Sequence, residues 1–176
     1  AFQSLGHCAD YYFMYGETPD EIIARVRDLT GHSPMLPLWA YGFFQSKERY
    51  HTQEENLSVL KKYRELRIPI DCMIQDWRYW PEYNRTDSAW NSHSFDPERF
   101  PNPKKWADEI HKLNAKLMIV AWPGFGPKTE QRKELDAKGM IINFDTWPPQ
   151  SGARPYDVYH PEARDISVSY THLRAH

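Results

Sequence analysis

Three short, nearly continuous apolar segments alternate with amphipathic ones, and this alternation limits the chain to few folds. The apolar segments are LWAYGFF at 38–44, IPIDCMIQ at 68–75 and KLMIVAW at 116–122. The intervening segments carry apolar residues at helical spacing, namely Leu57, Leu60, Tyr63 and Leu66 on the first face and Trp106, Ile110 and Leu113 on the second. Apolar strands that alternate with helices indicate a parallel sheet covered by helices, either a barrel or an open doubly wound sheet.

Local signals predict where further elements begin and end. Thr18-Pro19-Asp20-Glu21 and Thr52-Gln53-Glu54-Glu55 have the pattern of capping boxes, so we expect a helix after each threonine. The first of these helices should end at Gly31. The remaining predictions are a strand at 10–15, a polar loop at 81–94, a surface helix at 129–138 that ends at Gly139, and strands at 140–144 and 154–160.

Composition argues against several classes of partner and site. The net charge of −2 comes without a basic tract, so neither nucleic acid nor an anionic membrane is an expected partner, and no apolar run is long enough to span a membrane. Cys8 and Cys72 imply no disulfide framework, and the histidines lack metal-ligand spacing, so we expect no metal or cofactor. Ser46 lacks the setting of a nucleophile elbow, and no glycine-rich phosphate loop is present. The chain begins on Ala, which we interpret as the mark of a fragment or processed piece; whether the parent protein is periplasmic or secreted stays open.

The carboxyl ends of the predicted strands carry polar and aromatic side chains. These are Phe44, Gln45, Ser46 and Lys47 after the first strand, Gln75, Asp76, Trp77 and Tyr79 after the second, and Trp122 after the third. Ligands of parallel α/β folds bind at this edge of the sheet. A carboxylate accepts hydrogen bonds from sugar hydroxyls, and an indole covers the apolar face of a sugar ring, so the combination favours a carbohydrate site.

Simpler explanations exist for some of these residues. Asp76 has an alternative role as a helix cap or as an ion-pair partner of Arg78, and the residues alone weigh this role equally with sugar binding. For Trp39, Trp90 and Trp106 we favour core packing. Trp106 in particular lies on a predicted helix face that points at the sheet.

Several segments in order resemble glycoside hydrolase family 31, which contains α-glucosidases and α-xylosidases. YGETPDEIIARVRDLTGHSPMLPLWAYGF resembles the family's passage from an N-terminal β-sandwich into the first barrel strand, and QSKERYHTQEENLSVLKKYRELRIPIDCMIQDWRYW resembles its first helix and second strand. FDPERFPNP resembles the entry to the second helix, LNAKLMIVAWPGF the third strand, and ELDAKG and YDVYHPEARD the approach to strand four. The forms WAYGFFQSKERY and QDWRYW look more like the bacterial α-xylosidase branch, with its xyloglucan-acting enzymes, than like starch α-glucosidases.

The resemblance implies an α/β fold, a partial (β/α)8 TIM barrel of about the first three βα units preceded by a short β-α segment. The domains expected from it are the end of the N-terminal β-sandwich region with a linker helix at 1–36, the first part of the barrel at 37–166, and a non-native tail at 167–176. After PEARD the sequence ISVSYTHLRAH lacks the apolar face of the family's next helix, and SYTHLRAH resembles a translated sequencing adapter.

The resemblance also implies a retaining mechanism with one nucleophilic carboxylate and one acid/base carboxylate. In the family both lie beyond the matched segment, so no catalytic residue is expected in this chain, and we expect the chain alone to be inactive. Asp76 matches the strand-two aspartate that binds hydroxyls in subsite −1, and Trp122 matches the strand-three tryptophan that lines it. Phe44, Trp77 and Trp147 are further substrate-binding candidates, and loop packing is an equal alternative for Trp147.

The implied substrate is an α-linked xyloside or glucoside, for instance a xyloglucan-type oligosaccharide. Two other interpretations stay open. The first is a carbohydrate-binding chain without catalysis, and the second is a fragment of an α-galactosidase-like barrel hydrolase. The oligomeric state does not follow from the sequence.

Overall fold

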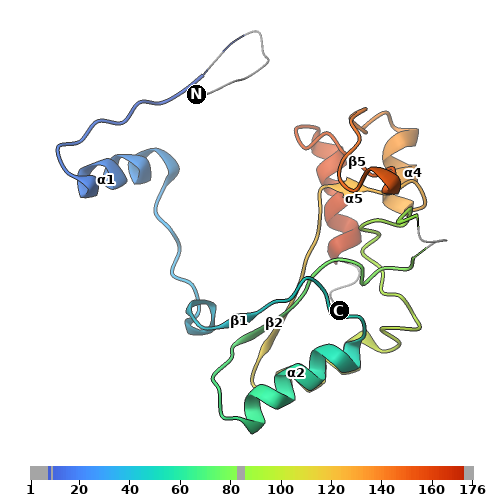
Figure 1. The fold of residues 1–176 in the computed structure, drawn as a ribbon. Coiled ribbons are helices and arrows are strands. Elements are labelled where there is room, and N and C mark those ends of the chain that lie inside the picture. Colours follow the sequence, from blue (N-terminus) through green and yellow to red (C-terminus); the bar gives the residue numbers. More distant parts are fainter. Residues whose placement is uncertain (1–7, 9, 83–85, 173–176) are drawn as a thin grey trace. The chain divides into compact units, whose positions relative to one another are not determined.

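The computed structural model describes residues 8, 10–82 and 86–172. The chain divides between Pro37 and Leu38 into two compact units. The N-terminal unit carries one helix among its described residues, α1 at Pro19–Thr30 (Figure 1). The C-terminal unit carries all the strands found in the described part of the chain.

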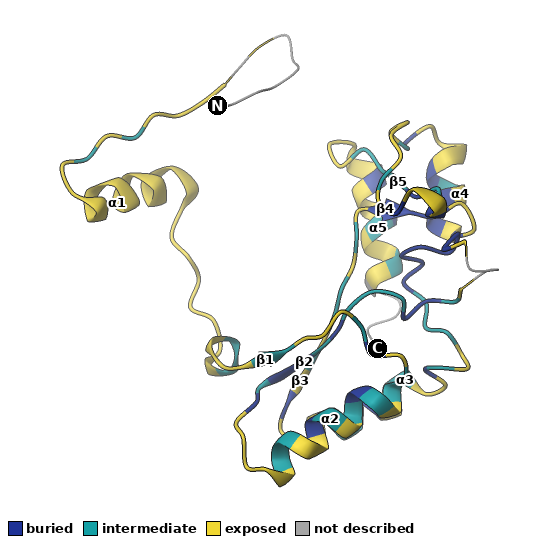
Figure 2. Cartoon of the chain, viewed as in Figure 1, coloured by how far each residue is buried: buried dark blue, intermediate teal, exposed yellow. Residues whose placement is uncertain are grey.

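The first helix forms where the capping box predicts it. Thr18 Oγ1 accepts a hydrogen bond of 3.3 Å from the backbone N–H of Glu21, and the helix stops before Gly31, whose φ of 84° suits glycine. None of the residues of α1 is buried, and Figure 2 shows the helix exposed along its length. Propensity and capping alone therefore define α1 within this unit.

The prediction of a strand at 10–15 is wrong. These residues form no regular element, and the side chains of Tyr11, Tyr12, Phe13 and Tyr15 are exposed. A β-strand needs a neighbour to pair its backbone N–H and C=O groups, and no strand of the described residues pairs with this segment.

Three parallel strands form the sheet of the C-terminal unit, in the order β1, β2, β3 (Figure 1). They are β1 at Phe44–Gln45, β2 at Cys72–Gln75 and β3 at Lys116–Ile119. The register pairs Phe44 with Cys72 across β1 and β2, and Gln75 with Ile119 across β2 and β3. The predicted parallel, helix-covered sheet is confirmed, and the described residues close no barrel.

The first predicted strand is largely wrong in its extent. Leu38–Tyr41 is a 3₁₀ turn, and only Phe44 of the segment 38–44 lies in β1. The cause lies at Gly42, where an added Cβ would be 1.9 Å from Asp71 Oδ2. Asp71 Oδ2 also accepts a 3.0 Å hydrogen bond from the N–H of Phe43, so its carboxylate stabilises the turn, and the strand begins only at Phe44.

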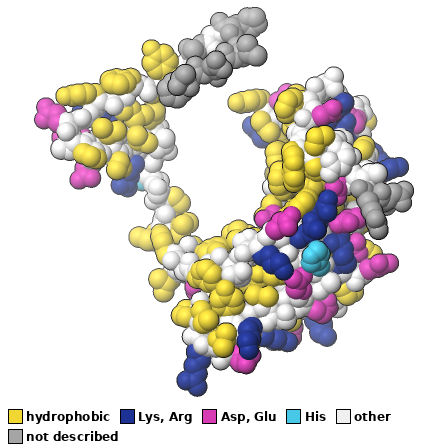
Figure 3. All heavy atoms as spheres, viewed as in Figure 1, with side chains coloured by type: hydrophobic (Ala, Val, Ile, Leu, Met, Phe, Trp, Pro, Cys, Tyr) yellow, Lys and Arg dark blue, Asp and Glu magenta, His cyan; other side chains and the backbone are white. Residues whose placement is uncertain are grey.

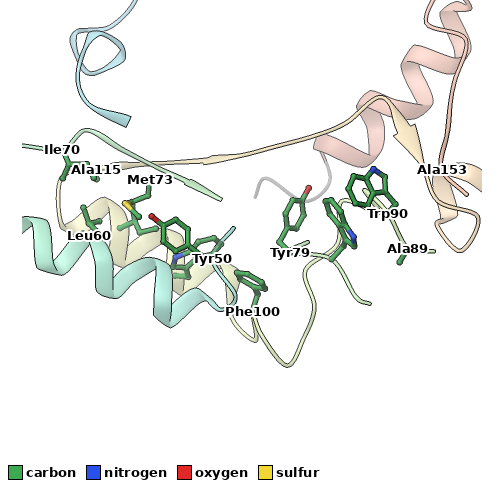
Figure 4. Close-up of a cluster of buried hydrophobic side chains, with 13 residues drawn as sticks. Tyr50, Leu60, Ile70, Met73, Tyr79, Ala89, Trp90, Phe100, Ala115 and Ala153 are labelled. Atoms are coloured by element: carbon green, nitrogen blue, oxygen red, sulfur yellow. The ribbon is translucent and has the colours of Figure 1, made fainter. Parts of the chain in front are cut away.

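Two helices cover one face of this sheet. They are α2 at Gln53–Glu65 and α3 at Pro103–Lys112. Thr52 caps α2 as predicted by accepting a 3.1 Å hydrogen bond from the N–H of Glu55, and the predicted helix faces are confirmed where Leu60, Trp106 and Ile110 are buried. Leu66 falls just past the end of α2 and is 55% exposed. Figure 4 shows Leu60 near Met73 of β2, within the cluster of buried residues that forms the main core.

Arg64 ties the amino-terminal edge of the sheet to α2. Its Nε donates to the carbonyl oxygen of Leu113 at 2.9 Å, and its Nη2 donates to those of Ile70 and Asn114 at 2.8 and 2.9 Å. These carbonyl groups lie in the turns that precede β2 and β3, so one side chain fixes both strand starts.

A second, smaller core lies under the C-terminal helices. Its elements are β4 at Gly124–Phe125, α4 at Glu130–Ala137, η2 at Pro149–Ser151, β5 at Arg154–Pro155 and α5 at Pro161–His172. Phe125, Leu135 and Ile166 are among its buried residues. The surface helix at 129–138 is confirmed. The strand predicted at 140–144 is wrong except for a bridge between Ile141 and Tyr156, and the strand predicted at 154–160 is reduced to β5, which pairs antiparallel with β4. These segments pair with each other and with β4, and not with β3, so neither extends the parallel sheet.

The segment 167–176 is helical as far as it is described. Helix α5 runs through it to His172, and Tyr170 Oη donates a 3.1 Å hydrogen bond to Glu134 of α4. Ile166, just before the segment, is buried in the second core. Residues 173–176 lie outside the described residues.

The C-terminal unit leaves apolar surface uncovered. Leu38, Tyr41, Ile68, Met118 and Phe144 are each at least 42% exposed, and Figure 3 shows hydrophobic side chains on the surface of this unit. β1 and β3 each pair on one side only among the described residues. Helices of the described residues are too short or too polar to cross a membrane. Within the same residues, no group of three or more histidine, cysteine or acidic side chains could hold a metal ion.

Candidate functional site

Asp76 and Phe44 lie on the face of the sheet opposite the covering helices. Gln45 accepts a 2.7 Å hydrogen bond from Tyr63 Oη of α2, and Gln75 donates one of 3.1 Å to the carbonyl oxygen of Tyr50, so both glutamines point toward the helices. Side chains alternate along a strand, which directs Phe44 and Asp76 to the other side. In a barrel this side is the interior, where the carboxyl ends of the strands open to ligand.

The two simpler roles weighed for Asp76 are absent from the described residues. Its Oδ1 accepts a 2.7 Å hydrogen bond from the N–H of Trp77, and no helix begins there for it to cap. Arg78 pairs with Asp87 instead, at 2.7 Å between Nη2 and Oδ2. The half-buried carboxylate of Asp76 thus keeps an oxygen that accepts no hydrogen bond within the described part of the chain. Such a group can accept from a sugar hydroxyl.

Five tryptophans gather beside the ends of β2 and β3. Trp90 is their centre, with ring centroids 5.6 Å from Trp77, 5.0 Å from Trp80, 5.3 Å from Trp122 and 5.7 Å from Trp147. Trp80 and Trp90 are fully buried, so the packing role expected for Trp90 is confirmed. Figure 4 shows Trp90 beside Ala89 and Ala153, at the opposite end of the main core from Leu60.

The exposed margin of this tryptophan cluster is formed by Trp122 and Trp147. Their rings stack at 6.1 Å with an interplanar angle of 27°, and Trp147 is 57% exposed. The fold therefore brings Trp77, Trp122 and Trp147 together from three separate segments of the chain. Two stacked indoles beside the carboxyl end of β3 offer a flat apolar surface of the kind on which a sugar ring packs.

Phe44 and Trp77 are less free to meet a ligand. The ring of Phe44 packs 6.0 Å from Trp39, away from the tryptophan cluster. The guanidinium groups of Arg49 and Arg78 lie 5.1 and 4.5 Å from the centroid of Trp77. These cation–π contacts occupy surface of the Trp77 indole that a sugar would otherwise cover.

The segment expected to be a polar loop at 81–94 is a buried part of this site. Its buried polar residues include Asp87, Ser88, Asn91 and Ser92. Residues 83–85 of the segment lie outside the described residues. Gly126 passes so close to it that an added Cβ would be 2.5 Å from the carbonyl oxygen of Ser88. The only sequence signal for this burial is Trp90 itself, an apolar residue within a polar stretch.

The titratable groups near the sheet show shifts with clear physical causes. The hydrogen bond from Lys47 lowers the pKa of Glu55 below its ordinary value of 4.5, and the backbone N–H of His51 adds to this effect. Burial raises the pKa of the Cys72 thiol, which keeps it protonated inside the sheet. Both shifts belong to structural contacts, because neither group lies in the tryptophan cluster.

Parallel βα units with a carboxylate and indoles at the carboxyl ends of their strands have the arrangement expected of a carbohydrate site in a (β/α) fold. The model of the glycosyl hydrolases family 31 TIM-barrel domain matches residues 33–174. The chain belongs to glycoside hydrolase family 31. This membership decides against the α-galactosidase-like alternative.

The relatives found are mainly α-xylosidases and α-glucosidases. An α-xylosidase of Saccharolobus solfataricus is 44% identical over 165 residues, which is 94% of this chain and 21% of that protein. The crystal structure of a family 31 α-xylosidase from Xanthomonas citri superposes with a TM-score of 0.80 at 37% identity, covering 90% of this chain and 17% of that one. An α-xylosidase from a soil metagenome, solved with xylose, gives a TM-score of 0.75 at 31% identity over 90% of this chain and 23% of that one. The chain thus spans about a fifth of the length of these relatives.

Proposed function

We propose that this chain supplies the first βα units of the catalytic barrel of a retaining α-glycoside hydrolase that acts on α-xylosides. The observation that carries the proposal is that Asp76 and Trp122 follow the carboxyl ends of the adjacent parallel strands β2 and β3, with Trp147 stacked on Trp122. Similarity to three α-xylosidases, one of them bound to xylose, supports xylose over glucose as the sugar. A xyloglucan-type oligosaccharide is the natural polymer-derived form of such a substrate.

In this proposal each side chain has one role. The Asp76 carboxylate accepts hydrogen bonds from vicinal hydroxyls of the sugar in subsite −1, and Trp122 packs on the ring. Trp147 extends the apolar surface beside Trp122, whereas Trp77 and Phe44 are weaker candidates because Arg49, Arg78 and Trp39 already contact their rings. Because the family's nucleophile and acid/base are expected beyond the segment that this chain matches, the proposal is that the chain binds sugar without cleaving it.

The domain boundaries are part of the same proposal. We infer that 1–36 is the end of an N-terminal β-sandwich region with its linker helix, that 37–166 begins the barrel, and that 167–176 is not encoded by the natural gene. The division of the structure at Pro37 supports the first boundary. Reading the source DNA past codon 166 tests the last: a frame that continues into a strand ending in Asp supports it, and a genomic SVSYTHLRAH followed by a stop contradicts it.

The experiment on function is a titration of the chain with xylose and with methyl α-xyloside, followed by calorimetry. Saturable binding is expected, and Asp76→Asn should weaken it about tenfold or more, because a hydrogen bond to a charged group is lost. Asp108→Asn is the matched control, since Asp108 is an exposed carboxylate on α3 that pairs with Lys104. Absence of saturable binding by the unmodified chain contradicts the proposal.

Catalysis is tested in the same preparation. Hydrolysis of an aryl α-xyloside should not exceed the rate in buffer, provided that host glycosidases have been removed. A rate above buffer that Asp108→Asn retains would show that the chain holds a nucleophile of its own. Saturable binding with zero turnover, together with a genomic stop after residue 176, would favour the alternative of a carbohydrate-binding chain.

A further inference from the structure

Asn91 lies in the buried segment 86–94 beside the tryptophan cluster, and its side chain makes three hydrogen bonds. It is completely buried and adopts a φ of 57°, in the left-handed region that asparagine tolerates better than most residues. The hydrogen bonds that its amide makes within the described part of the chain all go to the backbone of another segment.

Three hydrogen bonds join Asn91 to the chain that follows β3. Its Oδ1 accepts from the backbone N–H of Trp122 at 3.0 Å. Its Nδ2 donates to the carbonyl oxygen of Trp122 and, at 3.1 Å, to that of Gly124. Both ends of one amide therefore hold both backbone polar groups of Trp122, which fixes the backbone of this residue in position and in rotation.

The indole of Trp122 has no polar anchor of its own. Its Nε1 is buried and makes no hydrogen bond within the described part of the chain. The ring is held by its backbone and by ring contacts to Trp90 and Trp147. Trp90 precedes Asn91 in the sequence, so two consecutive residues hold Trp122: Trp90 contacts its ring, and Asn91 forms hydrogen bonds with its backbone.

We infer that Asn91 is a positioning residue of the sugar site, acting through Trp122. The inference rests on the proposed function, because the ligand it serves is the sugar that packs on Trp122. Asn91 itself does not touch the ligand: it is fully buried, and its amide is consumed by the backbone. Its effect is to present the indole at a fixed tilt before the sugar arrives, which lowers the entropy lost on binding.

Asn91→Gly removes the side-chain amide without straining the backbone, because glycine adopts a positive φ readily. Asn114→Gly is the matched control: Asn114 has a φ of 52°, its side chain is exposed, and it lies in the turn before β3, on the opposite edge of the sheet. Asn91→Asp is the second variant, since it keeps the shape and the oxygen that accepts from Trp122 but turns the donor into a carboxylate facing two carbonyl groups.

Two readouts test the inference on the full chain. The first is the near-ultraviolet circular dichroism of tryptophan, which reports ring–ring geometry and needs no ligand. Asn91→Gly and Asn91→Asp should alter it while Asn114→Gly leaves it as in the parent chain. If the two Asn91 variants keep the parent spectrum, or if Asn114→Gly changes it equally, the positioning role is overturned. A far-ultraviolet spectrum establishes that each variant is folded, and a variant that is not folded is set aside in favour of the other.

The second readout is sugar affinity in a double-mutant cycle with Trp122→Phe. Asn91→Gly should weaken xylose binding about three- to tenfold in the parent chain and have no further effect in the Trp122→Phe background. Equal weakening in both backgrounds would show that Asn91 does not act through Trp122. If the parent chain binds no sugar, the proposed function fails, while the circular dichroism still decides whether Asn91 holds Trp122.

Discussion

Trp90 offers the sharpest test of the tryptophan cluster, because it contacts the four other rings and is fully buried. Replacing a buried tryptophan by alanine costs about 3–5 kcal/mol, which is a large share of the roughly 5–15 kcal/mol by which a domain is stable. Phenylalanine is the better probe. It keeps part of the ring contacts, and we expect it to lower the free energy of unfolding by about 1–3 kcal/mol.

Trp106→Phe is the control for this change. Trp106 lies on α3, is 2% exposed and packs against Phe95 and Phe100, which precede the helix, but it contacts no ring of the tryptophan cluster. Urea unfolding followed by far-ultraviolet circular dichroism should therefore show similar losses for the two variants. Xylose titration should show weaker binding for Trp90→Phe alone, because only Trp90 supports Trp122 and Trp147. Equal affinity losses in both variants would refute the reasoning, since general destabilisation would then explain the effect.

Three smaller perturbations test local parts of the fold. Thr52→Ala should lower the free energy of unfolding by about 1 kcal/mol in a urea titration, whereas Thr18→Ala, on a helix without buried residues, should reduce helical circular dichroism with little change in the midpoint. Glu55→Gln should lower the free energy of unfolding at pH 7 and leave it equal to that of the parent chain at low pH. The folded pKa of Glu55 is lowered, so its stabilising effect is present above the ordinary value of 4.5 and is lost as the pH falls through the folded pKa. A difference in the free energy of unfolding that persists at low pH would contradict this. Gly126→Ala should lower the free energy of unfolding by about 1–3 kcal/mol in a urea titration, because an added Cβ would lie 2.5 Å from the carbonyl oxygen of Ser88. The loss should exceed that of Gly124→Ala, where the nearest atom, Thr146 Oγ1, is 3.2 Å from the added Cβ.

The parts of the fold that the sequence predicts are those with local causes. The two capping boxes place the starts of α1 and α2, because the threonine and its partner amide are three residues apart. The apolar runs place β2 and β3, and Trp106 and Ile110 place the buried face of α3, because periodicity within a segment sets which side is buried. Asp76 and Trp122 follow from the same logic, since each comes after such a run.

The predictions that failed depend on neighbours elsewhere in the chain. Residues 10–15 have the composition of a strand and lack a partner strand among the described residues. The segment 38–44 turns at Gly42 because of Asp71, which comes 28 residues after the Phe43 amide that it binds. Composition and periodicity show neither that residues 10–15 lack a partner strand in the described part of the chain nor that Asp71 binds the amide of Phe43. Prediction from single segments therefore assigns a strand in both places.

The segment expected as a polar loop shows why the orientation of the site is harder to predict than its location. Strand ends give the location, since Asp76 and Trp122 terminate predicted strands. Orientation comes from Asn91, which reaches partners 31 and 33 residues away, and from Asp87, which pairs with Arg78. Polar residues that serve a distant backbone look the same in sequence as polar residues that face water. On the proposed function, substitution of Asn91 should therefore lower sugar affinity while β1, β2 and β3 keep their pairing.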